Sequence, residues 1–327
     1  MTTAANIPPA SPDDLVEDDR PEHGGPAGTT VVPARRRGLG ERAARARTKL
    51  SSPWASLAAV VIAVLWTTPT LGLLITSFRP ELDIRRSGWW TFFADPSVTL
   101  ANYEEVITGS ATSSFAAFFV NSVVITVPAV VIPITLALLA AYAFAWIDFR
   151  GRSWLFVSVF ALQIVPIQIT LIPLLTQYNQ WGLAGSFWAV WLSHTIFALP
   201  LAIFLLHNFM MDIPRTLIEA ARMDGAGHVT IFFRVLLPLL VPAIASFAIF
   251  QFLWVWNDLL VATVFLGNTR EQLVMTGLLR ELMGSRGGEW EILATSAFIS
   301  IAVPLLVFFA MQKYLVRGLL AGSVKGG

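Results

Sequence analysis

A long stretch of this chain contains no charged side chain. Residues 153–211 include no Asp, Glu, Lys or Arg. A helix needs about 20 apolar residues to cross the hydrocarbon of a bilayer, so this stretch is too long for one membrane span. Polar and turn-forming residues at Tyr178-Asn179-Gln180-Trp181-Gly182 divide it. The pattern predicts a hairpin of two membrane spans, near residues 154–177 and 186–207.

Other apolar segments also have the length of a membrane span. They lie near residues 54–78, 118–146, 239–260 and 292–312. Hydrophobic residues make up 55% of the chain and charged residues only 13%, whereas soluble domains carry about 25% charged residues. We therefore predict an all-α polytopic membrane protein with six transmembrane helices.

The first 50 residues have a different composition. Residues 1–33 are acidic and rich in Pro, Ala and Gly, without apolar periodicity, so we predict a disordered tail. Residues 35–49 are basic and directly precede the first predicted span. A basic run in this place is typical of a cytoplasmic flank near anionic lipid, and nucleic-acid binding is the alternative.

The distribution of Lys and Arg predicts how the chain crosses the membrane. If the N-terminus lies inside the cell, sixteen of the 22 Lys and Arg residues fall in the inner segments. The outer segments then hold Arg79, Arg85, Arg86, Arg270, Arg280 and Arg286. Because cytoplasmic loops carry the excess of basic residues, we expect both termini in the cytoplasm of a multi-pass cell-membrane protein.

Residues 211–238, MDIPRTLIEAARMDGAGHVTIFFRVLLP, form a polar segment between two apolar ones. We predict a cytoplasmic helix–turn–helix that docks another protein. Asp212 can cap the first helix, and Pro214 is tolerated in its first turn. Gly225 and Gly227 are expected to end that helix, because glycine adopts the left-handed conformation of a C-terminal cap. A second helix is predicted over residues 228–236, and Pro238 opens the next apolar run.

The first of these helices is predicted to be two-faced. Helical spacing places an apolar set on one face: Ile213, Leu217, Ala220 and Ala221. A charged set falls on another face: Arg215, Glu219 and Arg222. These charges could simply pair with each other on a surface helix, or they could contact a partner protein.

The segment resembles the EAA loop of permease subunits of ABC importers. Glu219-Ala220-Ala221 is followed after three residues by Gly225, after nine more by Val235, and after one more by Leu237-Pro238. The pattern of that family has Ile where this chain has Val235. The resemblance implies a coupling helix that inserts into a cleft of a cytoplasmic ATPase, with Glu219 paired to a basic group there. The implied ATPase-coupling residues are Glu219, Ala220, Ala221, Asp224, Gly225, Leu237 and Pro238.

Shorter matches resemble the sugar-type branch of these permeases, and in particular the shorter maltose-permease partner subunit. They are Ser77-Phe78-Arg79-Pro80, residues 100–103, 121–122, 140–144, 149–152, 256–258, and residues 318–326 near the C-terminus. The resemblance covers residues 54–326 and implies the type I ABC importer permease fold. It also implies a second permease subunit, two cytoplasmic ATPase subunits, and an extracytoplasmic binding protein that delivers a carbohydrate, expected to be an oligosaccharide.

Polar residues inside the predicted spans are candidates for the substrate path. They are Gln163, Gln168, His194 and Asn257. The alternative is that they only form hydrogen bonds between helices. Pro166 and Pro173 should kink the third span. Asp258 falls at the end of a span and Asp148 at the inner edge, so we expect no buried carboxylate near the membrane midplane, where a self-sufficient secondary carrier would need one.

The sequence lacks the motifs of a catalytic chain. It has no phosphate-binding loop G-x-x-x-x-G-K-[ST], no H-E-x-x-H helix and no cysteine. We therefore expect no catalytic residues, no metal site and no cofactor, with ATP bound and hydrolysed by a partner ATPase. The alternatives are an ABC permease for a non-sugar solute, such as a polyamine or amino acid, and a self-sufficient carrier.

The outer loops also contain recognisable segments. Loop 79–114 carries Trp89, Trp90, Phe92 and Phe93, which suit an interfacial segment at the bilayer edge. Loop 267–291 holds a predicted helical patch over residues 272–283. It could be a simple connector, although its length and flanking glycines also suit a mobile loop that contacts a partner. The resemblance implies that this partner is the binding protein.

Overall fold

The computed structural model describes residues 53–108, 115–267, 272–284 and 289–323, with side chains as far as residue 314. The predicted tail, residues 1–50, and the terminal residues 324–327 lie outside the described part. The chain divides into two units, residues 1–63 and 64–327, with the boundary inside the first described helix. Only residues 53–63 of the first unit are described, so the following account concerns the second unit.

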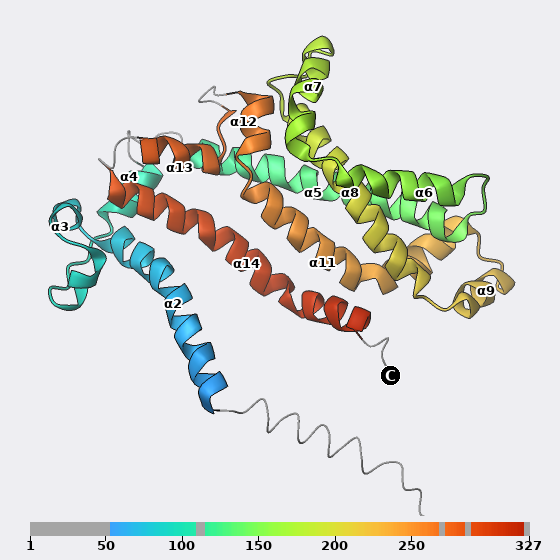
Figure 1. The fold of residues 1–327 in the computed structure, drawn as a ribbon, viewed down its shortest axis with the longest axis horizontal. Helices are drawn as coiled ribbons and strands as arrows, with labels where there is room; N and C mark the ends of the chain where they lie inside the picture. Colours follow the sequence, from blue (N-terminus) through green and yellow to red (C-terminus); the bar gives the residue numbers. More distant parts are fainter. Residues whose placement is uncertain (1–52, 109–114, 268–271, 285–288, 324–327) are drawn as a thin grey trace, which may run out of the picture. The chain divides into compact units, whose positions relative to one another are not determined.

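All regular elements of the described residues are helices (Figure 1). Five helical runs are long and apolar enough to cross a membrane. They are α2 (Pro53–Phe78), α5 (Phe115–Trp146), α8 (Phe187–Met211), the run His228–Trp256, and Trp290–Tyr314 within α14 (Trp290–Ser323). The run His228–Trp256 consists of α10 (His228–Thr230), η3 (Ile231–Leu236) and α11 (Leu237–Trp256).

The third predicted span is a bent pair of helices. The first part is α6 (Arg152–Ala161) with η2 (Leu162–Ile164), and the second is α7 (Ile167–Gln180). The two parts meet at 102°, and they make a sixth span if the pair crosses the membrane once. Pro166 precedes α7 as its N-cap, while Val165 is extended, as expected before a proline. The sequence predicted a kink here, and the structure has a complete break of the helix.

The core of the second unit is built on α5 and α8, which form its most extensive helix pair. Small buried residues line this region, among them Ala137, Ala141, Ala198 and Ala202. Small side chains let two helix backbones approach closely where there is no hydrophobic driving force between helices in lipid. α11 packs on both helices, and α14 packs on α11 (Figure 1). This arrangement fixes the ends of α5, α8 and α11 relative to each other.

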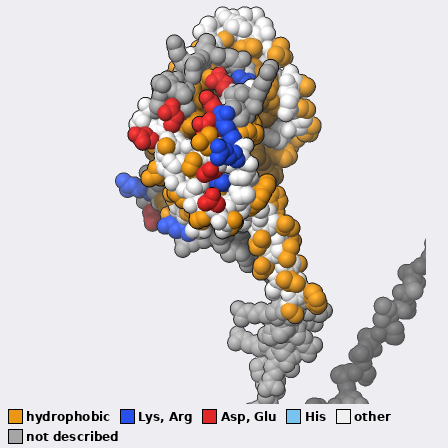
Figure 2. Space-filling model, turned by 90° about the vertical axis from the view of Figure 1, so that its left-hand side faces the viewer, with side chains coloured by type: hydrophobic (Ala, Val, Ile, Leu, Met, Phe, Trp, Pro, Cys, Tyr) orange, Lys and Arg blue, Asp and Glu red, His pale blue; other side chains and the backbone are white. Residues whose placement is uncertain are grey.

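A folded cap follows α2 at one end of the second unit. It consists of α3 (Glu81–Arg86), η1 (Trp89–Phe93) and α4 (Ala101–Thr108). Charged side chains of both signs gather on this end (Figure 2). Trp90 and Phe93 are 64% and 70% exposed, and their placement at a bilayer edge stays a prediction.

Hydrogen bonds hold the cap to the end of α2. Arg79 is buried, and its guanidinium donates to the carbonyl of Gly88 at 2.8 Å and to Thr91 Oγ1 at 3.1 Å. The Nδ2 of Asn102 donates to the carbonyls of Ser77 and Arg79. Such bonds satisfy carbonyls that the helix end leaves without partners.

The loop after α11 contains α12 (Leu260–Leu266) and α13 (Met275–Gly284). The helical patch predicted over residues 272–283 corresponds to α13, whose start lies three residues later. α13 is anchored to α5, because Asn121 Nδ2 donates to the carbonyl of Leu273 and the amide of Met275 donates to Ser122 Oγ. The segments 268–271 and 285–288 lie outside the described residues.

Candidate functional site

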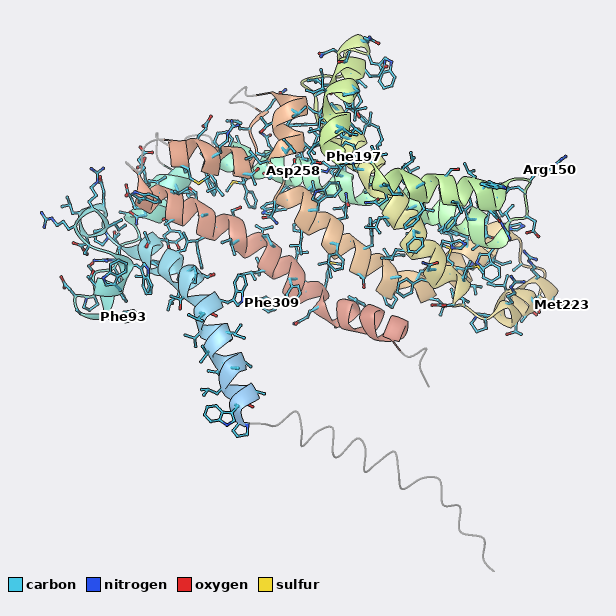
Figure 3. The ribbon with its side chains drawn as sticks, viewed as in Figure 1. Phe93, Arg150, Phe197, Met223, Asp258 and Phe309 are labelled. Carbon is cyan, nitrogen blue, oxygen red and sulfur yellow. The ribbon has the colours of Figure 1, made fainter. Side chains whose placement is uncertain are left out.

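The polar segment 211–238 lies at the end of the second unit opposite the cap. Its first helix is α9 (Arg215–Met223), followed after a short turn by α10 and η3. Figure 3 shows Met223 at the same end as Arg150, with Phe93 at the opposite end. The two loops that the sequence assigns to the inner side therefore lie together.

The packing of α9 differs from the predicted faces. Ile218, which the sequence analysis did not select, is its one buried residue, at 2% exposed. Ile213 and Ala221 pack beside the same core cluster, whereas Leu217 is 42% exposed and Met223 is 88% exposed. The predicted apolar set is therefore only partly covered, because Leu217 and Ala220 are exposed. α9 has apolar residues on both sides, so helical spacing is compatible with more than one choice of buried face.

The charged residues of α9 do not neutralise each other. Among the described residues, no ion pair involves Arg215, Glu219 or Arg222. The self-paired surface helix that the sequence left open is therefore not what the structure contains. Charges and exposed apolar residues remain together on the outward side of α9, as they would on a surface that meets another protein.

A left-handed glycine ends α9. Gly225 has φ of +82°, the amide of Gly225 donates to the carbonyl of Arg222, and the amide of Ala226 donates to that of Ala221. These two bonds form a Schellman cap. Gly227, which was expected to share this role, is extended instead and stands at the N-cap of α10.

The start of α9 also differs from the prediction. Its N-cap residue is Pro214, whose own side chain makes no capping hydrogen bond. Asp212, predicted as the cap, is instead the C-cap residue of α8. The loop between α8 and α9 is too short for both a cap residue and the proline, and the proline takes the cap position.

The last part of the motif lies on a widened helical turn. η3 is a π-helix, and its final bond runs from the amide of Leu237 to the carbonyl of Phe232. Pro238 follows without an N–H, and in an α-helix its ring would clash with the carbonyl four residues earlier. The wider turn accommodates this proline, so the helix continues into α11. Such π-turns occur often at functional sites.

One hydrogen bond joins the segment to the core helix α5. The hydroxyl of Tyr142 and the Nδ1 of His228 are 2.7 Å apart. The ring of Tyr142 also contacts the ring of Phe232 edge-on, with centroids 5.4 Å apart. The sequence analysis did not select Tyr142 or His228, because nothing in their spacing shows that α5 and α10 meet.

The predicted path residues separate into different places. Gln163 lines a cavity of about 410 Å³ between η2, α7 and α8, together with Thr170, Gln177 and Phe197. Figure 3 shows Phe197 on α8 near α7. The rest of the lining is apolar, so the cavity combines a few hydrogen-bonding groups with apolar walls, as sites for small organic ligands do.

The other path candidates do not line this cavity. Gln168 is exposed on α7. Asn257 is exposed, and its Nδ2 donates to the carbonyl of Leu253 on its own helix. His194 is fully buried on α8. The sequence thus grouped residues that the structure does not bring together.

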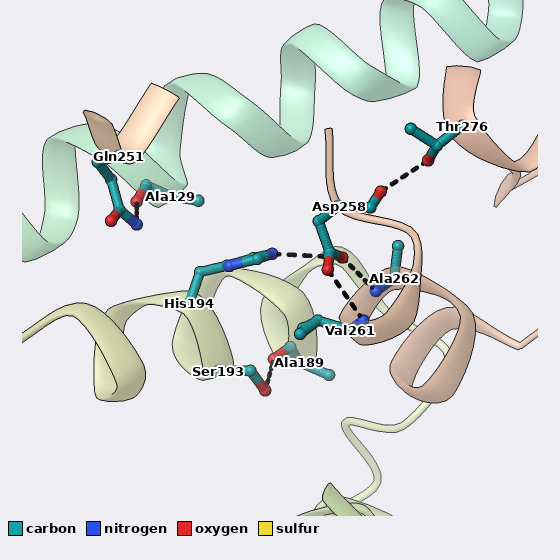
Figure 4. Close-up of polar contacts among 9 residues, drawn as sticks. All are labelled: Ala129, Ala189, Ser193, His194, Gln251, Asp258, Val261, Ala262 and Thr276. Carbon is teal, nitrogen blue, oxygen red and sulfur yellow. Dashed lines mark hydrogen bonds and ion pairs between the residues drawn. The ribbon is translucent and has the colours of Figure 1, made fainter. Parts of the chain in front are cut away.

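His194 faces a buried carboxylate (Figure 4). Its Nε2 lies 3.7 Å from Oδ2 of Asp258. The Asp258 side chain is 8% exposed, so this carboxylate is buried within the protein, although it stands at the end of α11 as expected. The backbone turns at the end of α11, and this turn points the Asp258 side chain inward. The carboxylate accepts hydrogen bonds from the amides of Val261 and Ala262 at the start of α12. These bonds make Asp258 a helix cap that also faces His194.

Among the described residues, no group of three His, Asp or Glu side chains is arranged to hold a metal ion. The polar groups of the site are amides, hydroxyls and isolated charges.

Comparison with known proteins gives one family. Residues 133–320 match the family described as "Binding-protein-dependent transport system inner membrane component". The chain is 54% identical over 273 residues to the osmoprotective compounds uptake permease protein GgtD of Synechocystis, covering 82% of this chain and 91% of that protein. It is 55% identical over 262 residues to the alpha-glucoside transport system permease protein AglG of Rhizobium meliloti, covering 77% and 68%.

A solved structure has the same fold. It is a bacterial ABC transporter involved in the import of the acidic polysaccharide alginate, with a TM-score of 0.69. The sequence identity is 20%, and the match covers 79% of this chain and 94% of that chain.

Proposed function

We propose that this chain, which belongs to the family of binding-protein-dependent transport system inner membrane components, is the permease subunit of an ATP-driven carbohydrate importer. It pairs with a second permease subunit, and the two form the translocation path. Two cytoplasmic ATPase subunits drive the cycle, and an extracytoplasmic binding protein delivers the solute. The chain is a transport subunit, and ATP is bound and hydrolysed by the separate ATPase chains.

The proposal rests mainly on the side chains that α9 exposes on its outward side. Leu217 and Met223 are exposed there, and Glu219 has no ion-pair partner among the described residues. In the cycle, ATP closes the ATPase dimer and moves the cleft that holds α9. The membrane helices then rock between inward-open and outward-open states.

The orientation follows from the charged loops. The inner set of basic residues includes Arg150 and Arg222, whose segments lie at one end of the second unit, while Arg79 lies in the cap at the other end. The excess of basic residues at the α9 end supports a cytoplasmic position for it and for both termini.

The substrate class follows from the named relatives. One is an α-glucoside permease and another takes up osmoprotective compounds, each more than half identical in the matched region. An α-glucoside is therefore the first carbohydrate to test. Gln163 is the strongest path candidate because it lines the cavity with Thr170 and Gln177. Gln168, His194 and Asn257 stay weaker candidates, since none of them faces that cavity.

Purification of the tagged chain from gently solubilised native membranes tests the docking role. We expect an ATPase subunit and a second permease to accompany it, identified by mass spectrometry. Glu219→Lys and Gly225→Asp should lose the ATPase and abolish uptake while the chain still inserts. Glu104→Lys on α4 is the matched control, because it makes the same charge reversal at the opposite end and should retain the ATPase.

Uptake of labelled maltose, sucrose and trehalose tests the substrate class. Transport of an α-linked disaccharide that depends on ATP supports the proposal. Uptake of a polyamine or amino acid instead would replace the carbohydrate by a non-sugar solute. Full uptake in the Glu219→Lys variant would refute the role of α9.

A further inference from the structure

The coupling loop, residues 212–238, is joined to the membrane helices at both of its ends. On one side Asp212, Ile213 and Pro214 connect α8 to α9. On the other side residues 224–227 connect α9 to α10, and the chain then continues through η3 into α11. α9 packs mainly against η3. A displacement of α9 therefore reaches the membrane helices through the short connection to α8 and through the segment after Met223.

The second connection contains two glycines, Gly225 and Gly227, which we call the glycine joint. Gly225 is left-handed, with φ of +82°, and Gly227 is extended. No atom lies within 4 Å of a Cβ placed on either glycine, so neither position is packed against neighbours. Glycine restricts the backbone less than any other residue. Ala226, between the glycines, packs beside the core cluster, and its amide donates to the carbonyl of Ala221, so the α9 side of the connection is held. Gly227 follows it without packed neighbours, so the residue after Gly227 decides how much of a displacement of α9 is passed on.

His228 is the first residue after the joint, and it is anchored. Its Nδ1 lies 2.7 Å from the hydroxyl of Tyr142, and the two rings meet edge-on with centroids 5.9 Å apart. Either atom can be the donor, depending on the histidine tautomer. Tyr142 is itself fixed, because it is 7% exposed within α5 and its ring packs against Phe232 of η3. The bond thus ties the far side of the joint to a rigid part of the core.

The bond ends on the helix that packs most extensively with α8. α9 is thereby linked to α8 directly and to α5 through Tyr142. We infer that Tyr142 and His228 are positioning residues, whose hydrogen bond makes a displacement of α9 move α5 and α8 together. The inference rests on the proposed function, since it assigns the route by which docking of the ATPase at α9 reaches the translocation path.

The hydroxyl group is the part of Tyr142 that this role requires. A phenylalanine would keep the ring contacts with Phe232 and would fill the same space. Within the described part of the chain, this hydroxyl is hydrogen-bonded to His228. Tyr142→Phe therefore removes the hydrogen bond that we propose links α9 to α5, while it leaves the ring packing in place.

The test uses the complete complex with its ATPase and binding protein in proteoliposomes. Uptake and ATP hydrolysis are measured in the wild type, in Tyr142→Phe, in His228→Ala and in the double variant. A hydrogen bond of ordinary strength shifts a conformational equilibrium by about fivefold. We expect each single variant to transport about fivefold less substrate per ATP hydrolysed. The double variant should lose no more than either single one, because both remove the same bond.

Two further variants separate this role from a structural one. His228→Gln keeps a side-chain group that can bond to the hydroxyl, and it should retain wild-type transport per ATP. Tyr103→Phe is the matched control, since it removes a tyrosine hydroxyl bonded to Ser77 at 2.9 Å in the cap, and it should also leave the ratio unchanged. An unchanged ratio in Tyr142→Phe, additive losses in the double variant, or a parallel fall of uptake, hydrolysis and inserted protein would overturn the inference.

A readout without sugar distinguishes this inference from the proposed substrate. Hydrogen exchange of residues 139–146 of α5 is compared with and without ATP and vanadate. A nucleotide-dependent change that is present in the wild type and lost in Tyr142→Phe supports the link, even if no carbohydrate is transported. A change of equal size in both proteins overturns it.

Discussion

Neighbouring residues on α9 should respond differently to truncation. Ile218 is 2% exposed and packs into the core cluster with Ile231 and Leu236, whereas Leu217 beside it is 42% exposed. Met223 is 88% exposed on the same helix. Replacing each by alanine therefore separates the inward side of α9, which holds the helix to the permease, from its outward side, which we propose docks the ATPase.

The expected magnitudes follow from these exposures. Full burial of a Leu or Met side chain stabilises by about 2 kcal/mol. For Leu217 roughly two fifths of the surface is left to bury on docking, so Leu217→Ala should weaken ATPase binding by about 0.8 kcal/mol, or about fourfold in Kd. Met223→Ala should cost about 1.7 kcal/mol, or more than about tenfold. Ile218→Ala creates a cavity and should destabilise the folded segment by about 2 to 4 kcal/mol.

Two measurements distinguish these outcomes. The Kd for the ATPase subunit is measured on the permease pair in nanodiscs by interferometry. Hydrogen exchange of the α9 amides is measured in the same samples without ATPase. Leu217→Ala and Met223→Ala should raise Kd and leave the exchange of α9 unchanged, while Ile218→Ala should accelerate the exchange of the whole helix.

The most specific test compares the loss of ATPase affinity in Leu217→Ala with that in Met223→Ala. If binding follows the area still exposed, Met223→Ala must weaken binding more than Leu217→Ala. An unchanged Kd in both variants would show that the outward side of α9 is not the docking surface. Faster exchange in Leu217→Ala would show that its packing on the permease has been misjudged.

Three further outcomes are expected elsewhere in the chain. Arg79→Lys should lower the free energy of unfolding of the detergent-solubilised protein by about 2 kcal/mol. An ammonium group cannot keep the hydrogen bonds that the guanidinium donates to the Gly88 carbonyl and to Thr91 Oγ1. Asp258→Ala should destabilise α12 by about 1 kcal/mol through loss of its bond to the Ala262 amide, seen as faster exchange of α12, and Asp258→Asn should cost less. Gln163→Ala should raise the KM for uptake by about fivefold with little change in maximal rate, and an unchanged KM would remove Gln163 from the path.

The chain's apolar segments predicted its membrane class, but not the geometry of every span. Hydropathy reports the length of an apolar run and is insensitive to its direction. The third span therefore appeared as one kinked helix, although it turns by 102° between η2 and α7. Pro166 marked the place correctly, because a missing N–H and a restricted preceding residue interrupt a helix locally. The angle depends on how α7 packs against α8 and α12, which the sequence does not display.

The coupling loop shows the same division between local and long-range information. Gly225 was identified correctly as the left-handed cap, since that requirement is local. The sequence did not show which side of α9 is buried, because apolar residues occur on both sides and only the position of η3 decides which side is covered. Asp258 was placed at a span end, and the turn that folds it toward His194 depends on the placement of α12. The contact of Tyr142 with His228 joins residues far apart in sequence and had no sequence signal.

α9 carries apolar residues on its buried side and on its exposed side. The inward side, through Ile218, holds α9 to η3, and the outward side, through Leu217 and Met223, is left for a partner. Attachment by both sides makes α9 a rigid insert, so that the remaining freedom lies in the glycine joint at Gly225. The anchoring of His228 directly after that joint therefore adds a direct link to α5, beside the packing of Ile218 and the short connection to α8.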